Sequence, residues 1–332
     1  MRVLKVDPTN PEPEAIAAAA AVLVAGGLVA MPTETVYGLG ANALDPEAVE
    51  RIFAAKGRPS FNPLIAHCAT LEDARRLASN WPAAAETLGE RFWPGPLTLV
   101  VPKAAEVPDR LTAGLPTVAI RVPEHPVALA LLSAVDFPVA APSANPFTGL
   151  SPTSAGHVVK GLTGKVDLLL DAGASALGIE STVVDLSGPR PVLLRPGALP
   201  IAALEEALGE PIAHSDGYEG AVSRPAPGMI GRHYSPRARL RIVSPADLRE
   251  VAGVEAKGGA ALGALLRSSP PLDGVEHVVT MPPDAPGYAS RLYASLHELD
   301  DAGCDVILVE EPPHGLPWAA VRDRLTRASR SD

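Results

Sequence analysis

Short apolar runs alternate with longer segments of helical composition from the N-terminus to residue 208. The runs are β-branched or aliphatic and only a few residues long, as is typical of buried strands. We predict strands at 28–31, 64–67, 97–101, 118–122, 139–141, 167–170, 181–185 and 192–195. We predict helices at 13–25, 46–55, 72–78, 83–92, 127–134 and 201–208. This alternation favours an α/β domain with a largely buried mixed sheet.

The pattern is lost after residue 208. Residues 209–236 are rich in Gly, Pro and Ser and show little periodicity, so they form either a linker or a functional lid. Arg224, Arg232 and Tyr234 argue against a plain spacer.

A second α/β pattern occupies residues 237–332. Strands are predicted at 240–243, 259–265, 277–281 and 306–310, and helices at 245–251, 289–302 and 319–328. We therefore predict two domains, 10–208 and 237–332, joined by the segment 209–236.

Composition narrows the range of functions. The formal net charge is −10, whereas proteins that bind nucleic acid tightly usually carry a basic face. The only cysteines, Cys68 and Cys304, are far apart, and without a CxxC pair they are expected to be reduced, buried thiols. The most apolar run, 15–31, is shorter than the ~20 residues that span a bilayer and follows an acidic stretch. We therefore expect a cytoplasmic protein with no membrane segment.

The sequence KGRP at 56–59 places two cations side by side in a predicted loop. Pro59 and Pro63 prevent a continuing helix. Lys56 is a point charge and Arg58 a planar fork, which together suit a polyphosphate, although a solvated basic loop has the same composition. His67, at a strand end, is a core histidine, a neutral hydrogen-bond donor or a ligand contact, and the residue alone favours the core histidine.

Small polar residues follow the strand at 139–141. Ser143 and Asn145 are two residues apart, so both can face one pocket in an extended turn. Open α/β sheets bind ligands beyond the carboxyl ends of their strands. No Ser/His/Asp arrangement nearby makes Ser143 a persuasive nucleophile.

Arg121 and Arg195 end two of the apolar strands. A charge there is costly unless it is paired or binds an anion, so each marks either a structural ion pair or an anion site. The segment 32–40, PTETVYGLG, is either a ligand-presenting loop or a plain turn. Because no GxxxxGK[ST] and no convincing GxGxxG occur, a nucleotide is not held by those loops. Together these features predict a phosphate-handling site.

Read together, the segments resemble the threonylcarbamoyl-AMP synthase family in its long form. The matching stretches are PTETVYGLGANA, KGRPSFNPL, FWPGPLTLV, TVAIRVP, APSAN, IESTVVD, LLRPG and PAPGMIGRHYSP. The resemblance implies a YrdC-like catalytic domain with an open twisted mixed sheet. It also implies a smaller, Rossmann-like α/β C-terminal domain, which matches mainly by position and size.

This resemblance implies a nucleotidyltransferase that makes L-threonylcarbamoyladenylate and pyrophosphate from L-threonine, bicarbonate and ATP. The product would pass to the tRNA threonylcarbamoyl transferase machinery, which forms N6-threonylcarbamoyladenosine at tRNA position 37. Mg²⁺ is expected on the ATP phosphates, although no carboxylate cluster for it is obvious. No stable nucleic-acid binding is expected.

Two alternatives share the YrdC-like fold. An RNA-binding module would need a contiguous basic face, which a net charge of −10 disfavours. Hydrogenase-maturation proteins with a YrdC-like domain carry zinc-finger segments, and this chain has no CxxC pairs.

The family's site residues carry over motif by motif. The threonine and carbamate side comprises Thr35, His67, Arg121, the Ala141 backbone and Ser181. The ATP side comprises Arg58, Asn62, Thr117, Ser143, Asn145, Ser151, Arg195 and Tyr234. Lys56 and Arg58 are the catalytic candidates, and Lys56 would offset charge between the carbamate and the α-phosphate. If Tyr234 contacts ATP, the segment 209–236 is a lid.

Overall fold

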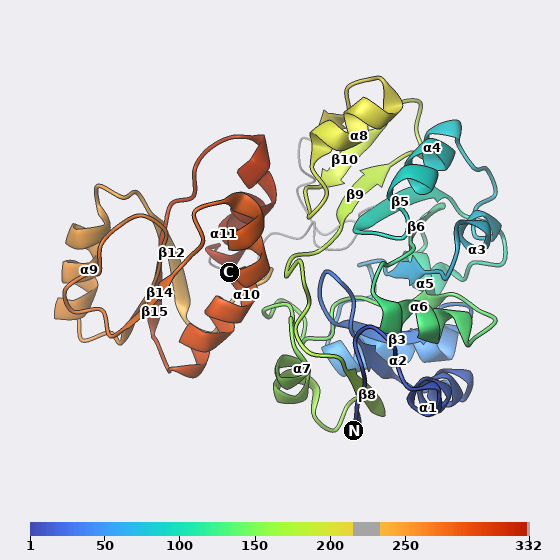
Figure 1. The fold of residues 1–332 in the computed structure, drawn as a ribbon, viewed down its shortest axis with the longest axis horizontal. Coiled ribbons are helices and arrows are strands. Elements are labelled where there is room, and N and C mark those ends of the chain that lie inside the picture. The colour runs from blue at the N-terminus through green and yellow to red at the C-terminus, as the bar shows by residue number, and fades with distance from the viewer. Residues whose placement is uncertain (215–232, 331–332) are drawn as a thin grey trace. The chain divides into compact units, whose positions relative to one another are not determined.

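The computed structural model describes residues 1–214 and 233–330, which form two compact units (Figure 1). The N-terminal unit comprises residues 1–147, 152–176 and 180–229, and the C-terminal unit comprises 148–151, 177–179 and 230–332. Arg224 and Arg232 of the predicted linker lie outside the described residues. The domain limits 10–208, 209–236 and 237–332 therefore stay a prediction.

The described part of the N-terminal unit is built on an 11-stranded mixed sheet with the order β1-β8-β2-β3-β7-β4-β6-β5-β9-β10-β11. The strands are β1 (Arg2–Lys5), β2 (Val29–Met31), β3 (Gly38–Asn42), β4 (Ile65–His67), β5 (Leu97–Pro102), β6 (Thr117–Arg121), β7 (Val139–Ala140), β8 (Leu168–Asp171), β9 (Thr182–Asp185), β10 (Val192–Arg195) and β11 (Ala213–His214). Parallel pairs such as β4 with β6 and β5 with β9 alternate with antiparallel pairs such as β5 with β6. The predicted α/β fold with a mixed sheet is confirmed.

Helices connect these strands. They are α1 (Pro13–Val24), α2 (Pro46–Lys56), α3 (Leu71–Arg76), α4 (Ala83–Phe92), α5 (Asp109–Thr112), α6 (Pro126–Ser133), α7 (Ala155–Leu162) and α8 (Ile201–Leu208). The ends of α2 follow from its sequence. The Asp45 side chain accepts a hydrogen bond from the Glu47 backbone N–H, and Gly57 closes the helix in the left-handed conformation with φ 63°.

The two faces of the sheet are covered differently. Helices α1 and α6 pack on one face, against Val29, Val139 and Leu168 among others. Helices α2, α4, α7 and α8 pack on the other face, against residues that include Leu39 and Ile120. A small separate cluster consists of strand residues from β4, β5, β6, β9 and β10, namely Ile65, Val100, Ala119, Val183, Leu194 and the partly buried Val192.

Five elements of this unit were not predicted: β1, β3, α5, α7 and β11. Strand β3, of sequence GLGAN, has low strand propensity, but it is held between β2 and β7, where a Cβ on Gly40 would lie 2.9 Å from a Val139 methyl. Helix α7 contains two glycines, and β1 is a mostly exposed edge strand. For β3, α7 and β1 the surrounding tertiary structure outweighs a weak local preference.

The C-terminal unit contains a four-stranded parallel sheet with the order β12-β15-β13-β14. Its strands are β12 (Arg239–Val243), β13 (Leu262–Leu266), β14 (His277–Thr280) and β15 (Val306–Glu310). Its helices are α9 (Leu248–Lys257), α10 (Ala285–Asp301) and α11 (Ala319–Ala328), with a 3₁₀ turn η1 (Leu316–Trp318). Helix α10 begins four residues before the predicted start at 289 because Asp284 caps it, accepting from the Gly287 N–H.

Two short stretches that precede residue 180 belong to the C-terminal unit. The Ser235 N–H donates to Thr148 O at 2.9 Å, and His297 Nε2 lies 3.2 Å from Ser151 O. At Gly178, φ is +64° and a Cβ would come within 2.3 Å of the Ser290 carbonyl oxygen. Residues 148–151 and 177–179 are therefore fixed by contacts with residues far along the chain.

Among the helices that the structure describes, none combines the length and apolar character needed to cross a membrane.

Candidate functional site

The candidate site lies along one face of the central strands of the N-terminal unit. Strands β4 and β6 are parallel, and His67 is the Cα partner of Arg121. Because side chains alternate along a strand, Thr117, Ala119 and Arg121 share one face of the sheet. His67 also pairs with Val139, which packs under α1 and α6, so this is the same face.

The pairing of β4 with β6 places the site residues at two opposite ends of these strands. His67 and Arg121 close their strands together at one end, and Thr117 opens β6 at the other. At ~3.3 Å per residue, Thr117 and Arg121 are about 13 Å apart along the strand. The loop that carries Arg58 and Asn62 leads into the start of β4, and so lies toward the Thr117 end. Of the predicted residues, His67 and Arg121 thus lie at one end of these strands, and Arg58, Asn62 and Thr117 lie toward the other.

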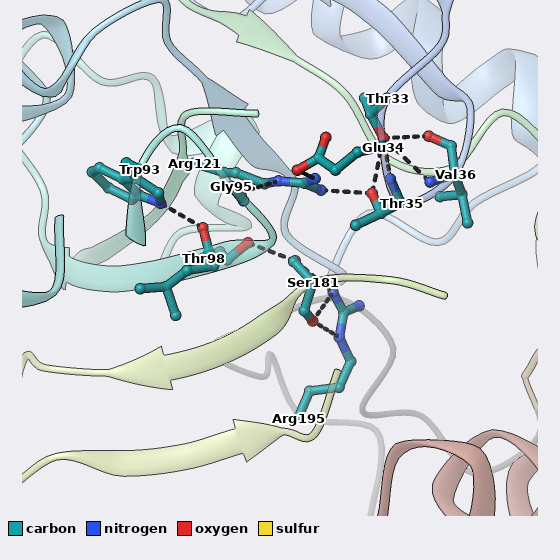
Figure 2. Close-up of polar contacts among 11 residues, drawn as sticks. Thr33, Glu34, Thr35, Val36, Trp93, Gly95, Thr98, Arg121, Ser181 and Arg195 are labelled. Atoms are coloured by element: carbon teal, nitrogen blue, oxygen red, sulfur yellow. Dashed lines mark hydrogen bonds and ion pairs between the residues drawn. The ribbon is translucent and has the colours of Figure 1, made fainter. Parts of the chain in front are cut away.

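Arg121 is buried, and its guanidinium group is held by three residues (Figure 2). Nε donates to Gly95 O at 3.3 Å, one terminal nitrogen donates to Thr35 Oγ1 at 2.9 Å, and the other forms a 2.6 Å ion pair with Glu34 Oε1. The five N–H groups of arginine leave donors for a ligand beside these contacts. The sequence left two interpretations of Arg121, a structural ion pair or an anion site. The structure contains the ion pair with Glu34, and the remaining N–H donors are compatible with an anion site as well.

A tight turn presents Glu34 and Thr35 to Arg121. The Thr33 hydroxyl donates to Val36 O at 2.6 Å and accepts from the Val36 N–H at 3.2 Å. It also lies 2.8 Å from Thr35 Oγ1. These hydrogen bonds fix the backbone of the PTETV segment, as threonine commonly does in turns.

Lys56 is almost fully buried at the end of α2. Its Nζ donates to Ser143 O and Asn145 O, both at 2.5 Å, and to Asn145 Oδ1 at 3.3 Å. Lys56, Ser143 and Asn145, three of the predicted site residues, therefore lie together, joined mainly through main-chain carbonyls. Burial, and secondarily the charge of Arg58, holds the Lys56 pKa well below its usual value.

Arg58 organises the loop between α2 and β4. Its Nε donates to Asn62 O at 3.1 Å and a terminal nitrogen donates to Pro63 O at 2.9 Å. The Asn62 side chain is buried, and its Nδ2 has no hydrogen-bond partner among the described residues. A buried donor without a partner costs free energy, so this atom is suited to a ligand acceptor.

Ser181 and Arg195 are joined at the β9 end of the site (Figure 2). A terminal nitrogen of Arg195 donates to Ser181 O at 3.0 Å and to Ser181 Oγ at 3.1 Å, and Arg195 Nε donates to Ser181 O at 3.2 Å. The Ser181 hydroxyl also lies 2.7 Å from Thr98 Oγ1. A predicted threonine-side residue and a predicted ATP-side residue are thus in direct contact.

The remaining predicted residues are more dispersed. Ala141 follows β7, and its N–H donates to Ile65 O at 3.0 Å, beside β4. Ser151 and Tyr234 belong to the C-terminal unit. There the Tyr234 ring is buried, with the Arg324 guanidinium 5.1 Å from its centroid.

Three polar residues of the site were not predicted: Thr33, Glu34 and Thr98. Thr98 is a hydroxyl residue in an otherwise apolar strand, and this interruption was a usable signal. Glu34 lies in a segment that was recognised, but its role depends on Arg121, which is 87 residues away in the chain.

His67 is buried, with Nδ1 3.3 Å from Ile65 O. Burial, and then the charge of Arg121, lowers the pKa of His67 to about 3. The imidazole is therefore neutral at physiological pH and suits hydrogen bonding rather than pairing with an anion.

This shift predicts a pH-dependent stability. Between pH 6.5 and pH 3 the unfolded chain binds a proton at His67 that the folded protein does not, so wild-type stability falls as the pH is lowered through this window. The slope from this residue approaches about 1.4 kcal/mol per pH unit. In urea unfolding, His67→Gln is expected to flatten this decline, and His214→Gln, at an exposed position, is not. Parallel curves for wild type and His67→Gln would contradict the assignment.

Cys68 and Cys304 are buried free thiols, as predicted. The described residues contain no group of three or more His, Cys, Asp or Glu side chains that could hold a metal ion.

Comparison with known proteins gives two family matches. The model Sua5_yciO_yrdC, described as telomere recombination, matches residues 21–197. A model described as the threonylcarbamoyl-AMP synthase C-terminal domain matches residues 200–330.

Individual relatives match over nearly the whole chain. The threonylcarbamoyl-AMP synthase of Pyrococcus abyssi is 46% identical over 321 residues, which cover 94% of this chain and 93% of that protein. The Bacillus subtilis threonylcarbamoyl-AMP synthase is 41% identical, covering 95% and 92%. The crystal structure of P. abyssi Sua5 complexed with L-threonine matches with a TM-score of 0.94 and 42% identity, covering 99% of this chain and 98% of that chain.

Proposed function

The chain belongs to the threonylcarbamoyl-AMP synthase family, and we propose that the two ends of its site hold the two substrates that this family joins. The enzyme makes L-threonylcarbamoyladenylate and pyrophosphate from L-threonine, bicarbonate and ATP. The product serves the formation of N6-threonylcarbamoyladenosine at tRNA position 37. We propose that it passes in the cytoplasm to a separate tRNA-modifying transferase.

L-Threonine binds at the Arg121 end in this proposal. The guanidinium group takes the carboxylate, and Thr35, held against it at 2.9 Å, positions the amino acid. Neutral His67 and the Ser181 hydroxyl offer uncharged hydrogen-bonding groups on the same side. The backbone of Ala141, the remaining proposed threonine contact, lies beside Ile65 at the start of β4.

ATP extends toward the Thr117 end. Asn62 offers a buried N–H donor and Arg58 a guanidinium group in the loop before β4. The other proposed ATP contacts are Thr117, Ser143, Asn145, Ser151, Arg195 and Tyr234. Mg²⁺ would arrive bound to the ATP phosphates, whose negative charge it partly neutralises, since the described side chains offer it no cluster of their own.

The reaction requires two anions to meet. An oxygen of the threonine carbamate attacks the α-phosphorus of ATP, and pyrophosphate leaves. Because attacker and target repel each other, positioning and fixed positive charge supply most of the rate enhancement. Lys56, the last residue of α2, contacts the Ser143 loop, where its amine can offset this repulsion.

One observation supports the proposed separation of the threonine end from the ATP end. His67 and Arg121 are Cα partners at one end of parallel strands, whereas Thr117 begins β6 at the other. An amino acid clamped at the first end can direct its carbamate along the sheet toward phosphates at the second.

The direct test is pyrophosphate release from ATP, measured with and without L-threonine and bicarbonate. Release is expected only when all three are present. Release that did not depend on threonine would overturn the proposal.

A truncated chain tests whether the linker is a lid. A fragment of residues 1–208 lacks Tyr234 and the residues that contact 148–151 and 177–179. If the linker shields a labile adenylate from water, pyrophosphate release should fall about tenfold or more while the fragment stays folded by circular dichroism. Full activity in a folded fragment would exclude the lid.

A further inference from the structure

The threonine end of the site contains a carboxylate, Glu34, although the threonine carboxylate and the ATP phosphates are themselves negatively charged. The Glu34 side chain is buried, with 8% of its surface exposed, and Oε1 pairs with Arg121 at 2.6 Å. The second oxygen, Oε2, is also buried and has no hydrogen-bond partner among the described residues. A buried carboxylate oxygen without a partner is costly, so its presence beside an anion-binding arginine calls for a ligand that donates.

L-Threonine brings such a donor. When an α-amino acid places its carboxylate on Arg121, its ammonium group is only one carbon away, next to Glu34. Oε1 already points at Arg121, which leaves Oε2 for the ammonium N–H. Arg121 thus pairs with the carboxylate of the amino acid, and Glu34 pairs with its ammonium group.

Formation of the carbamate requires that the ammonium group lose a proton. Only the neutral amine has a lone pair that can attack the carbon of bicarbonate. We propose, on the basis of the function above, that Glu34 is a catalytic residue that binds the threonine ammonium group through Oε2 and accepts the proton that this step releases.

The step balances as follows. An ammonium proton moves to Glu34 Oε2, giving a neutral amine and a neutral carboxylic acid. The amine nitrogen then forms a bond to the bicarbonate carbon, the C–OH bond breaks, and the hydroxide leaves as water with a second proton from nitrogen. The carbamate keeps one N–H, and the proton on Glu34 returns to solvent after the product departs.

This transfer also changes what Arg121 binds. A neutral Glu34 is a weaker partner for the guanidinium group than a carboxylate. Arg121 then binds the substrate carboxylate more strongly, while Thr35 and Gly95 keep the guanidinium group in place. Before threonine arrives, Glu34 therefore compensates the charge of Arg121 and holds its orientation.

Glu34→Gln tests the proposal because the amide keeps a hydrogen-bond acceptor for Arg121 but cannot take up the proton. Threonine-dependent pyrophosphate release is expected to fall by about 10²–10⁴-fold, the usual contribution of a general base. The reverse reaction needs no such base, because pyrophosphate attacks the α-phosphorus and the carbamate leaves with its N–H intact. ATP formation from pyrophosphate and threonylcarbamoyl-AMP, made with the wild-type enzyme, should stay within about threefold of wild type.

If Glu34 had a purely structural role, Glu34→Gln would lower the forward and reverse rates by the same factor. Either that result or a forward rate near wild type would overturn the proposal. If Glu34→Gln does not fold, Glu34→Asp provides the same comparison, because its oxygen is withdrawn by one methylene. Its ratio of forward to reverse rates should fall, and an unchanged ratio would overturn the proposal.

The matched control is Glu86→Gln, which alters another carboxylate–arginine pair of the N-terminal unit, with Arg75. This substitution should leave the rates of the forward and reverse reactions unchanged. Wild-type release that is independent of threonine would instead overturn the proposed function, so the two failures are distinguishable.

Discussion

Lys56→Met is expected to lower threonine-dependent pyrophosphate release by about 10³-fold, more through kcat than through KM. The Lys56 amine is the buried cation that binds the carbonyl oxygens of Ser143 and Asn145. Its charge matters most when the carbamate and the α-phosphate come together, which is the transition state rather than the ground state.

The fold should survive this substitution. The lost hydrogen bonds destabilise the 143–145 loop, but removal of a buried cation also removes the burial cost that depresses the Lys56 pKa. These effects oppose each other, so the free energy of unfolding should change far less than the activity. Lys165→Met, at an exposed lysine of the same unit, is the control. A kcat within a few-fold of wild type for Lys56→Met would refute the catalytic assignment.

Arg121→Lys should reduce kcat/KM for L-threonine by about 10²-fold or more while the KM for ATP stays within about threefold. The guanidinium group donates in three directions at once, to Gly95, Thr35 and Glu34. A lysine ammonium keeps the charge but cannot reproduce this planar arrangement. It therefore cannot clamp a carboxylate in a fixed orientation.

Steady-state kinetics with each substrate varied in turn provide the measurement. Arg75→Lys, which alters an arginine paired with Glu86 and Glu72, controls for a general loss of arginine contacts. Equal losses for threonine and for ATP would contradict the assignment of Arg121 to the threonine end.

The sequence predicted the elements that bury a continuous apolar stripe. Helix α4 at Ala83–Phe92 and strand β10 at Val192–Arg195 have the predicted bounds because local pattern and tertiary packing agree there. Strand β3 was missed because glycines provide no side-chain pattern. Its two neighbours in the sheet, β2 and β7, determine its conformation.

The same distinction applies to the site. The sequence made Lys56, Ser143 and Asn145 candidate residues, but it did not predict that the amine would bind main-chain carbonyls, which every residue possesses. The role of Glu34 in the site could not be inferred from its own segment, because a glutamate there could equally well be exposed to solvent. Only the return of the chain at β6, which brings Arg121 beside it, gives this carboxylate a role.

The interleaved chain path restricts how such an enzyme can be recombined. A chimaera that joins residues 230–332 to a foreign catalytic domain would receive the C-terminal sheet but not residues 148–151 and 177–179, which complete that unit. At position 178 a donor sequence would need glycine, because any Cβ there would overlap the Ser290 carbonyl group. A functional exchange therefore requires that both short loops be transplanted together with the C-terminal half.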